Sequence, residues 1–396
     1  MEKKVKISWV APVLMSFFIM SIIDLVGISV DKVKEDMQLS NTLVQLIPSV
    51  TFLWFFLLSV PVGIMQARIG KRLMLNIGMG ITALGLLIPY FYYSFSMVLL
   101  CFIFLGIGNT IIQVSANPLL VDVVPQNRAS SFLSFSQFVK AIGSMAGPPV
   151  AAVMASRFGD WKLMYVAFGA VSILSIIWLG SVKIKESKQN ETKATIASSF
   201  KLLGTNYILI MVIAIFLVVG IDVAFNSNSG QFLMNRIGVE PEAAKMGRSV
   251  YFFGRLLGTL AGAVLLTKIS SRKILLWSSI LGIITFGILL LIRSQIIAWT
   301  LVFVTGVAIA TIFPIVFALS VEKFPTRSNE ISGLIMMAIS GGAVLPLLVG
   351  ALSDISNIAV GMTILLLCWF YLLGVSIYAL KQEKLNSKVI MNEVKN

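Results

Sequence analysis

Four ionisable side chains interrupt long apolar stretches of the sequence: Asp24, Lys140, Asp222 and Arg255. An ionised group at the centre of a bilayer costs about 2.5–3.5 kcal/mol on insertion scales, so such groups face a bundle interior or a wet cavity. A carboxylate in that position can take up a proton or Na+, and we predict this role for Asp24 and Asp222. Lys140 can pair with Asp24 or hold a bound ligand, and the pairing favours Asp222 as the group that takes up the cation. The alternative for both aspartates is a static ion pair that fixes helix packing.

Amide and hydroxyl side chains recur at helical spacing in the same stretches. The sets that share one helical face are Asn109, Gln113 and Asn117; Gln137, Lys140 and Ser144; and Asp222, Asn226 and Ser229. Because an amide offers both donors and acceptors, such a face suits a hydroxyl-rich ligand. We predict ligand-binding roles for Gln113, Asn117, Gln137, Lys140 and Asn226. The alternative is hydrogen bonding between helices, which we favour for Asn109 and keep open for Asn117, because Pro118 follows it.

The elements that carry these side chains are predicted to be transmembrane helices. The chain has 396 residues, of which 58% are hydrophobic and 12% charged, and its mean hydropathy is +0.95. A helix needs about 20 apolar residues to span a bilayer. Twelve runs have about this length, at residues 8–30, 43–66, 71–93, 96–121, 130–156, 161–182, 205–230, 248–267, 273–293, 297–320, 331–352 and 358–380. The pattern predicts an all-α membrane protein in contact with lipid, without room for a soluble catalytic domain.

The distribution of lysine and arginine predicts the orientation of these helices. Most lysines and arginines lie in the tails and in the even-numbered turns between helices. Because such residues are enriched on the cytoplasmic side, both termini are expected to be cytoplasmic. The net charge of +14 therefore reflects membrane orientation, and we expect no nucleic-acid partner. The longest polar connection divides the chain into an N-terminal six-helix bundle at 1–182, a cytoplasmic linker at 183–204 and a C-terminal six-helix bundle with a short cytoplasmic tail at 205–396.

The two predicted bundles repeat each other in sequence. The basic turn that contains Arg68 and Arg72 has a counterpart that contains Lys268 and Arg272, and other parallels pair Pro118 with Pro314, and Ala141, Ile142 and Pro149 with Ala338, Ile339 and Pro346. Internal duplication of a polytopic chain is typical of secondary transporters, which bind substrate between the repeats. We therefore expect twelve transmembrane helices in two pseudo-symmetric six-helix bundles.

The turn Gly63-x-x-x-Ala67-Arg68-x-Gly70-Lys71-Arg72 resembles the signature loop of the major facilitator superfamily, with Ala67 in place of the usual aspartate. More narrowly, nearly the whole chain resembles the fucose/glucose-galactose permease branch of sugar symporters. The segments that carry this resemblance are Gln113-Val-Ser-Ala-Asn117-Pro118, Gly254-Arg255-x-x-Gly258-Thr259, Phe313-Pro314-x-x-Phe317, Ile339-Ser-Gly-Gly-x-x-x-Pro346 and Gly350-x-x-Ser353-Asp354.

The resemblance implies the major facilitator fold and a symporter of a hexose or deoxyhexose in the cytoplasmic (inner) membrane. Such a carrier works by alternating access with H+ or Na+ and needs no other cofactor; we expect a monomer. Two positions depart from the branch: Gln113 stands where it has a glutamate, and its first-helix aspartate aligns with Gly27, about one turn from Asp24. The alternative substrate is an acidic sugar or other organic anion, held by Lys140.

Charged residues at the predicted cytoplasmic ends are candidate gating residues. We expect Asp122 and Glu322 to bind cations of the basic turns when the inner gate is closed. The gating set is Arg68, Arg72, Asp122, Arg128, Arg272 and Glu322. The alternative is ordinary positive-inside topology with solvated acids.

Common catalytic devices are absent from the sequence. The alternative from another class is a polytopic membrane enzyme or receptor. It has little support, because the chain contains no histidine, no Walker A loop and no zincin helix. The two cysteines, Cys101 and Cys368, both fall in apolar runs and are too few for a metal cluster or a disulfide framework. We therefore expect neither enzymatic activity nor a bound metal.

Overall fold

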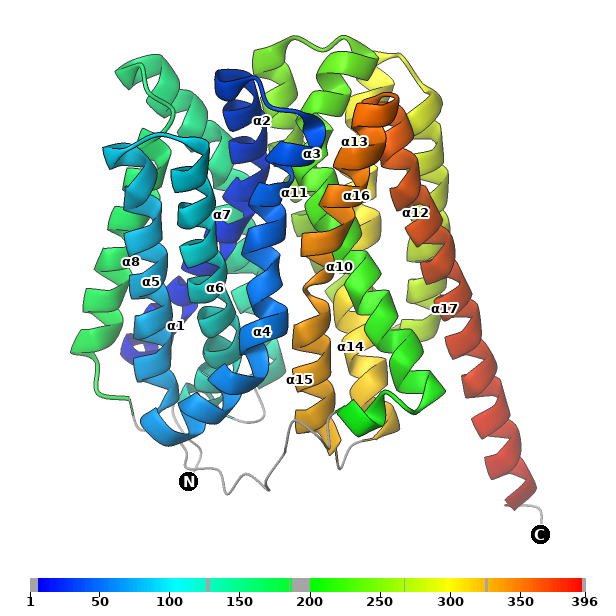
Figure 1. The fold of residues 1–396 in the computed structure, drawn as a ribbon. Helices are drawn as coiled ribbons and strands as arrows, with labels where there is room; N and C mark the ends of the chain where they lie inside the picture. The colour runs from blue at the N-terminus through cyan, green and yellow to red at the C-terminus, as the bar shows by residue number, and fades with distance from the viewer. Residues whose placement is uncertain are drawn as a thin grey trace.

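The computed structural model describes residues 6–125, 129–184, 186, 200–266, 268–324 and 327–393. The regular elements in these residues are helices, and most of them run side by side along one direction (Figure 1). The chain is therefore all-α, as its hydropathy pattern predicts.

The first half of the chain forms a broken first span and five further long helices. The first span consists of α1 (Ile7–Met20), the 3-10 helix η1 (Ser21–Leu25) and α2 (Val26–Met37). The remaining helices of this half are the short α3 (Asn41–Val44), α4 (Leu46–Ile69), α5 (Lys71–Phe91), α6 (Phe95–Val123), α7 (Ala129–Phe158) and α8 (Leu163–Ser181).

The second half begins with α10 (Asn206–Phe232), which continues into the π-helical η3 (Leu233–Ile237). It goes on with α11 (Pro241–Leu265), α12 (Ser271–Leu291), α13 (Gln295–Ile309), α14 (Ile312–Lys323), α15 (Ser328–Ala338), α16 (Gly341–Ile355) and α17 (Ile358–Glu393). Two of the predicted spans are interrupted here, because α13 and α14 together form one crossing segment, as do α15 and α16.

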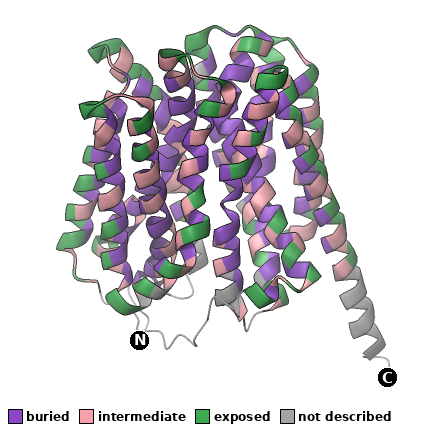
Figure 2. Ribbon diagram, viewed as in Figure 1, coloured by how far each residue is buried: buried purple, intermediate pink, exposed green. Residues whose placement is uncertain are grey.

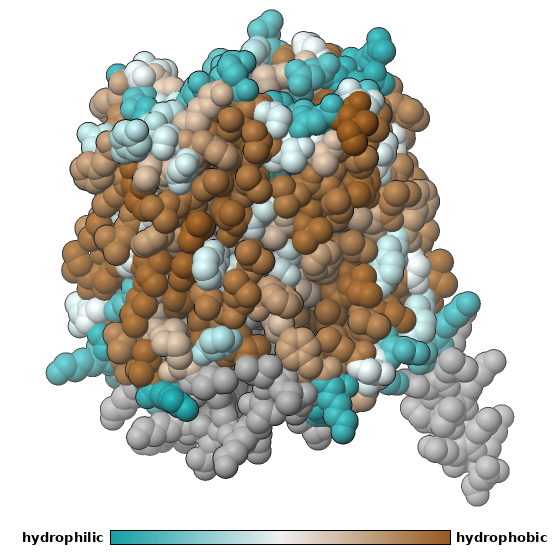
Figure 3. Space-filling model, in the orientation of Figure 1, coloured by the Kyte–Doolittle hydropathy of each residue, from teal (hydrophilic) through white to brown (hydrophobic). Residues whose placement is uncertain are grey.

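Eleven segments within the described residues are helical, long and apolar enough to cross a membrane. Each corresponds to one predicted run, and the predicted run at 248–267 has no counterpart among them. The helix at that place is α11, which carries the charged side chains of Arg248 and Arg255. On the molecular surface an apolar belt separates two polar rims, as a bilayer requires (Figure 3). By this criterion the predicted count of twelve is not reached.

The beginning of α1 and the end of α17 lie at the same end of the bundle (Figure 1). We call this the terminal end, and the opposite end, where α2, α3 and the α16–α17 turn lie, the distal end. An odd number of crossings would place the two ends of the chain on opposite sides. Their position is therefore compatible with α11 as a further crossing helix, and the side of the membrane that they face stays a prediction.

Each half buries its own apolar core (Figure 2). Phe17, Phe102 and Tyr165 are fully buried in the first core, and Phe286 and Trp369 are fully buried in the second. Many large apolar side chains outside the cores stay exposed, as expected for a surface that faces lipid instead of water. Most of the linker predicted at 183–204 lies outside the described residues, so the predicted domain limits stay predictions.

The break in the first span is the local feature that positions Asp24. The helix changes from α to 3-10 geometry at Ser21–Leu25, and Asp24 lies within this stretch. On α6, the Asn109 amide donates a 2.8 Å hydrogen bond to the main-chain oxygen of Met20, directly before the break. A mid-helix 3-10 stretch often marks a functional hinge. The buried amide of α6 therefore anchors the point at which the first span can bend.

Candidate functional site

Asp24 is half-buried at the break in the first span and faces α7. The Ser144 hydroxyl of α7 lies 2.5 Å from Asp24 Oδ2 and donates a hydrogen bond to it. The charges of Lys140 and Arg255 attract the carboxylate and that of Asp222 repels it. Among the described residues, no cation contacts it at ion-pair distance. Asp24 is thus a carboxylate held by a hydroxyl within a group of charges, which suits the uptake of a proton or Na+.

Asp222 has two strong partners, both on α11. The Tyr251 hydroxyl donates a 2.5 Å hydrogen bond to Oδ1, and Arg255 Nη1 lies 2.8 Å from Oδ2. The side chains of Arg255 and Asp222 keep 29% and 22% of their exposure, whereas Tyr251 is completely buried. Because both carboxylate oxygens are engaged, the geometry favours a charged, ion-paired Asp222.

Lys140 lies one turn before Ser144 on α7, and its side chain is partly exposed. Among the described residues, no hydrogen bond or contact ion pair holds its ammonium group. Its charge is attracted by Asp24 and Asp222 and repelled by Arg255. The sequence offered a contact between Lys140 and Asp24 as one possibility; in the structure the Asp24 carboxylate contacts Ser144 instead.

These four charges form a group between the two halves. Asp24 and Lys140 come from the first half, and Asp222 and Arg255 come from the second. With two acids and two bases, the group is electrically neutral when all four are charged. One added proton gives it a net positive charge, which the protein can balance with an anion or use to change the pairing of the remaining charges.

The amides of α6 form a ladder along one helical face. Gln113 Nε2 donates to Asn109 Oδ1 at 2.9 Å, and Asn117 Nδ2 lies 3.5 Å from the main-chain oxygen of Gln113. Asn109 is fully buried and binds Met20, in agreement with the structural role favoured for it. Gln113 and Asn117 are only half-buried, so parts of both amides stay open to a ligand.

Two further predicted ligand-binding residues lie at different depths. Gln137 is exposed on α7, one turn before Lys140. Asn226 is buried on α10, and its amide donates a 3.1 Å hydrogen bond to the main-chain oxygen of Asp24. Asn226 therefore joins the second half to the break in the first span, and its ligand-binding role stays a prediction.

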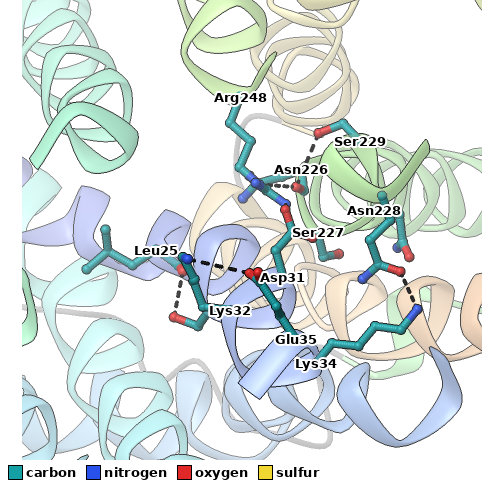
Figure 4. A network of polar contacts seen from close by, with 12 residues as sticks. Leu25, Asp31, Lys32, Lys34, Glu35, Asn226, Ser227, Asn228, Ser229 and Arg248 are labelled. Carbon is teal, nitrogen blue, oxygen red and sulfur yellow. Dashed lines mark hydrogen bonds and ion pairs between the residues drawn. The ribbon is translucent and has the colours of Figure 1, made fainter. Parts of the chain in front are cut away.

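A buried ion pair close to this group escapes sequence reasoning. Arg248 on α11 lies 2.6 Å from Asp31 on α2, and Arg248 Nε donates a 2.8 Å hydrogen bond to the main-chain oxygen of Asn226 (Figure 4). A periodic signal for it exists, because Asp31 follows Asp24 by seven residues and Arg248 precedes Arg255 by seven. Two turns of helix keep such residues on nearly the same face.

The candidate gating acids form ion pairs within their own halves. Asp122 contacts Lys71 at 2.9 Å, and Glu322 contacts Arg272 at 3.1 Å. The two pairs occupy equivalent places in the repeat, since each joins the start of one helix, α5 or α12, to the end of the next crossing segment, α6 or α13–α14. The partner of Asp122 described here is Lys71, which the predicted gating set does not contain.

The remaining gating candidates have varied surroundings. Arg72 donates hydrogen bonds to the main-chain oxygens of Leu179 and Gly180 at the end of α8. Arg68 is exposed, and Arg128 lies outside the described residues. Glu186 accepts hydrogen bonds from the main-chain N–H groups of Lys71 and Arg72, at 2.6 and 3.0 Å. This carboxylate binds the N-terminus of α5, directly after the signature-like turn in which Ala67 replaces an aspartate.

Comparison with known proteins places this geometry in a family context. A family model described as the Major Facilitator Superfamily matches residues 13–346. The glucose/galactose transporter of Brucella abortus biovar 1 (strain 9-941) is 27% identical over 371 aligned positions, and the alignment covers 87% of this chain and 87% of that chain.

Solved structures share the fold at lower identity. The fucose:proton symporter of E. coli overlays with a TM-score of 0.68 at 17% identity, over 93% of this chain and 98% of that chain. A bacterial homologue of the lysosomal transporter Spinster overlays with a TM-score of 0.75 at 17% identity, over 96% of this chain and 97% of that chain. These matches extend over almost the whole bundle, including both groups of helices that carry the four charges.

Proposed function

Because the chain belongs to the major facilitator superfamily, whose members are transporters and not enzymes, we propose that it is a secondary active sugar transporter. It is a multi-pass membrane protein. The proposed substrate is a hexose or deoxyhexose, carried by alternating access together with H+ or Na+. The 27% identical Brucella abortus relative, named a glucose/galactose transporter, supports the substrate class.

The proposed topology has twelve crossing helices in the cytoplasmic (inner) membrane, with α11 as the eighth. Three observations support α11 as a crossing helix: its 25 residues, its packing against α7 and α13, and the position of both chain ends at the terminal end. Its arginines face Asp31 and Asp222, so neither charge has to face lipid. On this topology the terminal end is cytoplasmic.

The observation that carries the proposal is the charge group between the halves, in which Asp24 alone among the acids contacts no cation within the described residues. We assign cation coupling to Asp24, whereas Asp222 is fixed by Tyr251 and Arg255. A proton or Na+ on Asp24 removes a charge from a group that both halves share. The loaded carrier can then reorient with a different balance of attraction between its halves.

The proposed sugar-binding residues surround this group. Gln113 and Asn117 offer amides from α6, and Gln137 and Lys140 offer donors from α7. Asn226 on α10 offers its amide to the sugar once its hydrogen bond to the main-chain oxygen of Asp24 is broken. Because sugar hydroxyls both donate and accept hydrogen bonds, side-chain amides are well suited to bind them.

Uptake by proteoliposomes tests this function. Labelled glucose, galactose and fucose are supplied under an imposed pH gradient or sodium gradient, with protein-free liposomes as the control. We expect saturable uptake of at least one sugar that falls to background when an ionophore dissipates the gradient. Uptake that ignores both gradients would exclude symport, and uptake of none of the sugars would exclude the proposed substrate class.

A sugar acid or other organic anion is the second candidate substrate, favoured by Lys140. An ammonium group without a contact partner among the described residues, close to Asp24 and Arg255, can hold a carboxylate. Lys140→Gln separates the two candidates in the same proteoliposomes. Selective loss of hexonate uptake supports the anion, whereas unchanged uptake of hexose and hexonate removes Lys140 from the binding site.

A further inference from the structure

The ion pair between Asp31 and Arg248 joins the two halves of the protein. The atoms Asp31 Oδ2 and Arg248 Nη2 are 2.6 Å apart, and the side chains are only 3% and 1% exposed. Asp31 belongs to α2 in the first half, and Arg248 belongs to α11 in the second. Any movement that separates the halves at this level must therefore pull two opposite charges apart inside the protein.

Two glycines make the space for this pair. At Gly27 on α2, a Cβ atom would collide with the Arg248 side chain and with Asn226. At Gly230 on α10, a Cβ atom would collide with the carboxylate of Asp31. The guanidinium group thus lies in a slot formed by closely packed helices of both halves, with no room for larger side chains.

Asn226 connects this slot to the proposed coupling site. Its main-chain oxygen accepts the hydrogen bond from Arg248 Nε, and its amide donates to the main-chain oxygen of Asp24. Asn226 also lies one helical turn beyond Asp222 on α10. Figure 4 shows Asn226, Asp31 and Arg248 converging from three helices. A change in the pairing of Asp24 or Asp222 therefore acts on residues that contact the ion pair directly.

Other polar contacts join the halves on the same side of the charge group. Lys34 donates a 2.8 Å hydrogen bond to Gln231, and Gln45 donates one of 2.9 Å to Asn228. Asp354 accepts hydrogen bonds from the main-chain N–H groups of Asn41 and Thr42 at 2.8 and 2.7 Å. All three connect α2–α4 to α10 or α16 towards the distal end. The halves are thus closed there, and Asp31 and Arg248 lie at the inner side of this closure.

We propose that Asp31 and Arg248, supported by Asn226, act as a latch that positions the halves in the conformation closed at the distal end. This inference rests on alternating access as the proposed mode of action. The latch residues are positioning residues, and they need not touch the substrate. A buried ion pair that loses one partner leaves an uncompensated charge, whereas an exposed polar contact can be replaced by water at little cost. The buried ion pair, more than the neutral hydrogen bond between Gln45 and Asn228 or the exposed contacts of Asp354, therefore sets the balance between closed and open forms.

Distance measurements between spin labels at the distal end test the latch. The labels are attached to cysteines introduced at Gln38 and Asn357, which are exposed and belong to different halves. The native Cys101 and Cys368 are first replaced by serine. Asp31→Asn and Arg248→Gln are then compared with Glu35→Gln, whose carboxylate is exposed and pairs with Lys32 within the same half. All variants are measured without substrate, so the result does not depend on which sugar is carried.

We expect Asp31→Asn and Arg248→Gln each to raise the population with a long label distance by about tenfold or more, with Glu35→Gln unchanged. The double variant should add little to either single variant, because one interaction is lost in all three. Distances that stay unchanged in both single variants would overturn the latch.

Arg248→Lys provides a second variant in case a neutral substitution prevents folding. Lysine keeps the positive charge but loses the planar guanidinium group and its Nε hydrogen bond to the main-chain oxygen of Asn226. An intermediate increase in the long-distance population supports the latch, and no increase in a folded Arg248→Lys protein counts against it. If distances respond but no sugar is taken up, the latch stands and the proposed substrate is wrong.

Discussion

The hydroxyl of Ser144 donates a hydrogen bond to the carboxylate of Asp24, and this contact ties α7 to the break in the first span. The carboxylate of Asp222 instead has two partners on α11, the hydroxyl of Tyr251 and the guanidinium group of Arg255. Two acids that look alike in the sequence therefore have different environments. A hydroxyl can stay in place when the carboxylate takes up a proton, whereas an arginine loses its ion pair.

This difference predicts that one of two matched substitutions impairs coupled transport and that the other lowers thermal stability. Asp24→Asn should abolish gradient-driven uptake in proteoliposomes while the exchange of internal for external sugar continues, because only the cation site is lost. Asp222→Asn should instead lower thermal stability, because Arg255 loses its ion-pair partner inside the bundle. Uptake assays and thermal unfolding in detergent check both effects. Gradient-driven uptake by Asp24→Asn at the level of the original protein would contradict the assignment.

Tyr251→Phe isolates the second partner of Asp222. The ring can keep its edge contact with Phe225 and its tilted contact with Phe252, while the hydroxyl bonded to Asp222 is lost. A hydrogen bond to a charged group contributes about 1.5–3 kcal/mol, so we expect a clear decrease in the thermal midpoint. Tyr207→Phe is the control, because its hydroxyl binds the neutral main-chain oxygen of Leu319. A smaller loss for Tyr251→Phe than for Tyr207→Phe would contradict the importance of the Asp222 contact.

The α6 ladder should separate a structural amide from a ligand-binding one. Asn109→Ala leaves the buried main-chain oxygen of Met20 without its partner and should cost about 1–3 kcal/mol of stability. Gln113→Ala should change stability little and instead raise the sugar concentration needed for half-maximal uptake. Thermal unfolding and uptake kinetics of both variants provide the check, and the reverse pattern would assign ligand binding to Asn109.

Much of this architecture could be predicted because the bilayer restricts polar groups so strongly. The apolar runs located eleven spans, and the cost of intramembrane charge singled out Asp24, Lys140, Asp222 and Arg255. The spacing of Asn109 and Gln113 indicated their shared face. These inferences need only local periodicity and the energetics of polar groups in lipid.

The latch could not be predicted because the relevant helices extend beyond their apolar runs. The first run was predicted to end at residue 30, whereas α2 continues to Met37 and carries Asp31. The eighth was predicted to begin at residue 248, which puts Arg248 at the very end of that helix, whereas α11 begins at Pro241 and carries Arg248 two turns inside. Charged extensions of this kind resemble turns in a hydropathy profile. Their pairing depends on the contact between halves, which is a tertiary property.

Tyr93, in the turn between α5 and α6, predicts a dependence on alkaline pH. Burial, and then its hydrogen bond to Asp36 at 2.8 Å, raise the pKa of this phenol above its usual value. The pKa of Tyr93 is therefore higher in the folded protein than in the unfolded chain, where it is about 10. The contribution of the neutral phenol to folding stability is complete below that pH and is lost as the pH rises above it. Tyr93→Phe should therefore show a shallower loss of thermal stability above pH 10 than the original protein. Equal slopes would contradict this contribution.

The two repeat-related ion pairs at the terminal end should differ in strength although they occupy equivalent places. The side chains of Lys71 and Asp122 are 9% and 4% exposed, whereas Glu322 is 61% exposed beside Arg272. Breaking a buried pair costs about 3–5 kcal/mol, and an exposed pair contributes about 0–1 kcal/mol.

Asp122→Asn should therefore lower the thermal midpoint strongly, and Glu322→Gln should leave it nearly unchanged. If Asp122 also gates the terminal end, its neutral variant should expose a cysteine placed in the vestibule at that end to a water-soluble thiol reagent, measured below the unfolding temperature. Labelling at the original rate, together with a lowered midpoint, would limit Asp122 to a structural role within the first half. Duplication would then have preserved the ion pair in both halves while burial made only one of them important for stability.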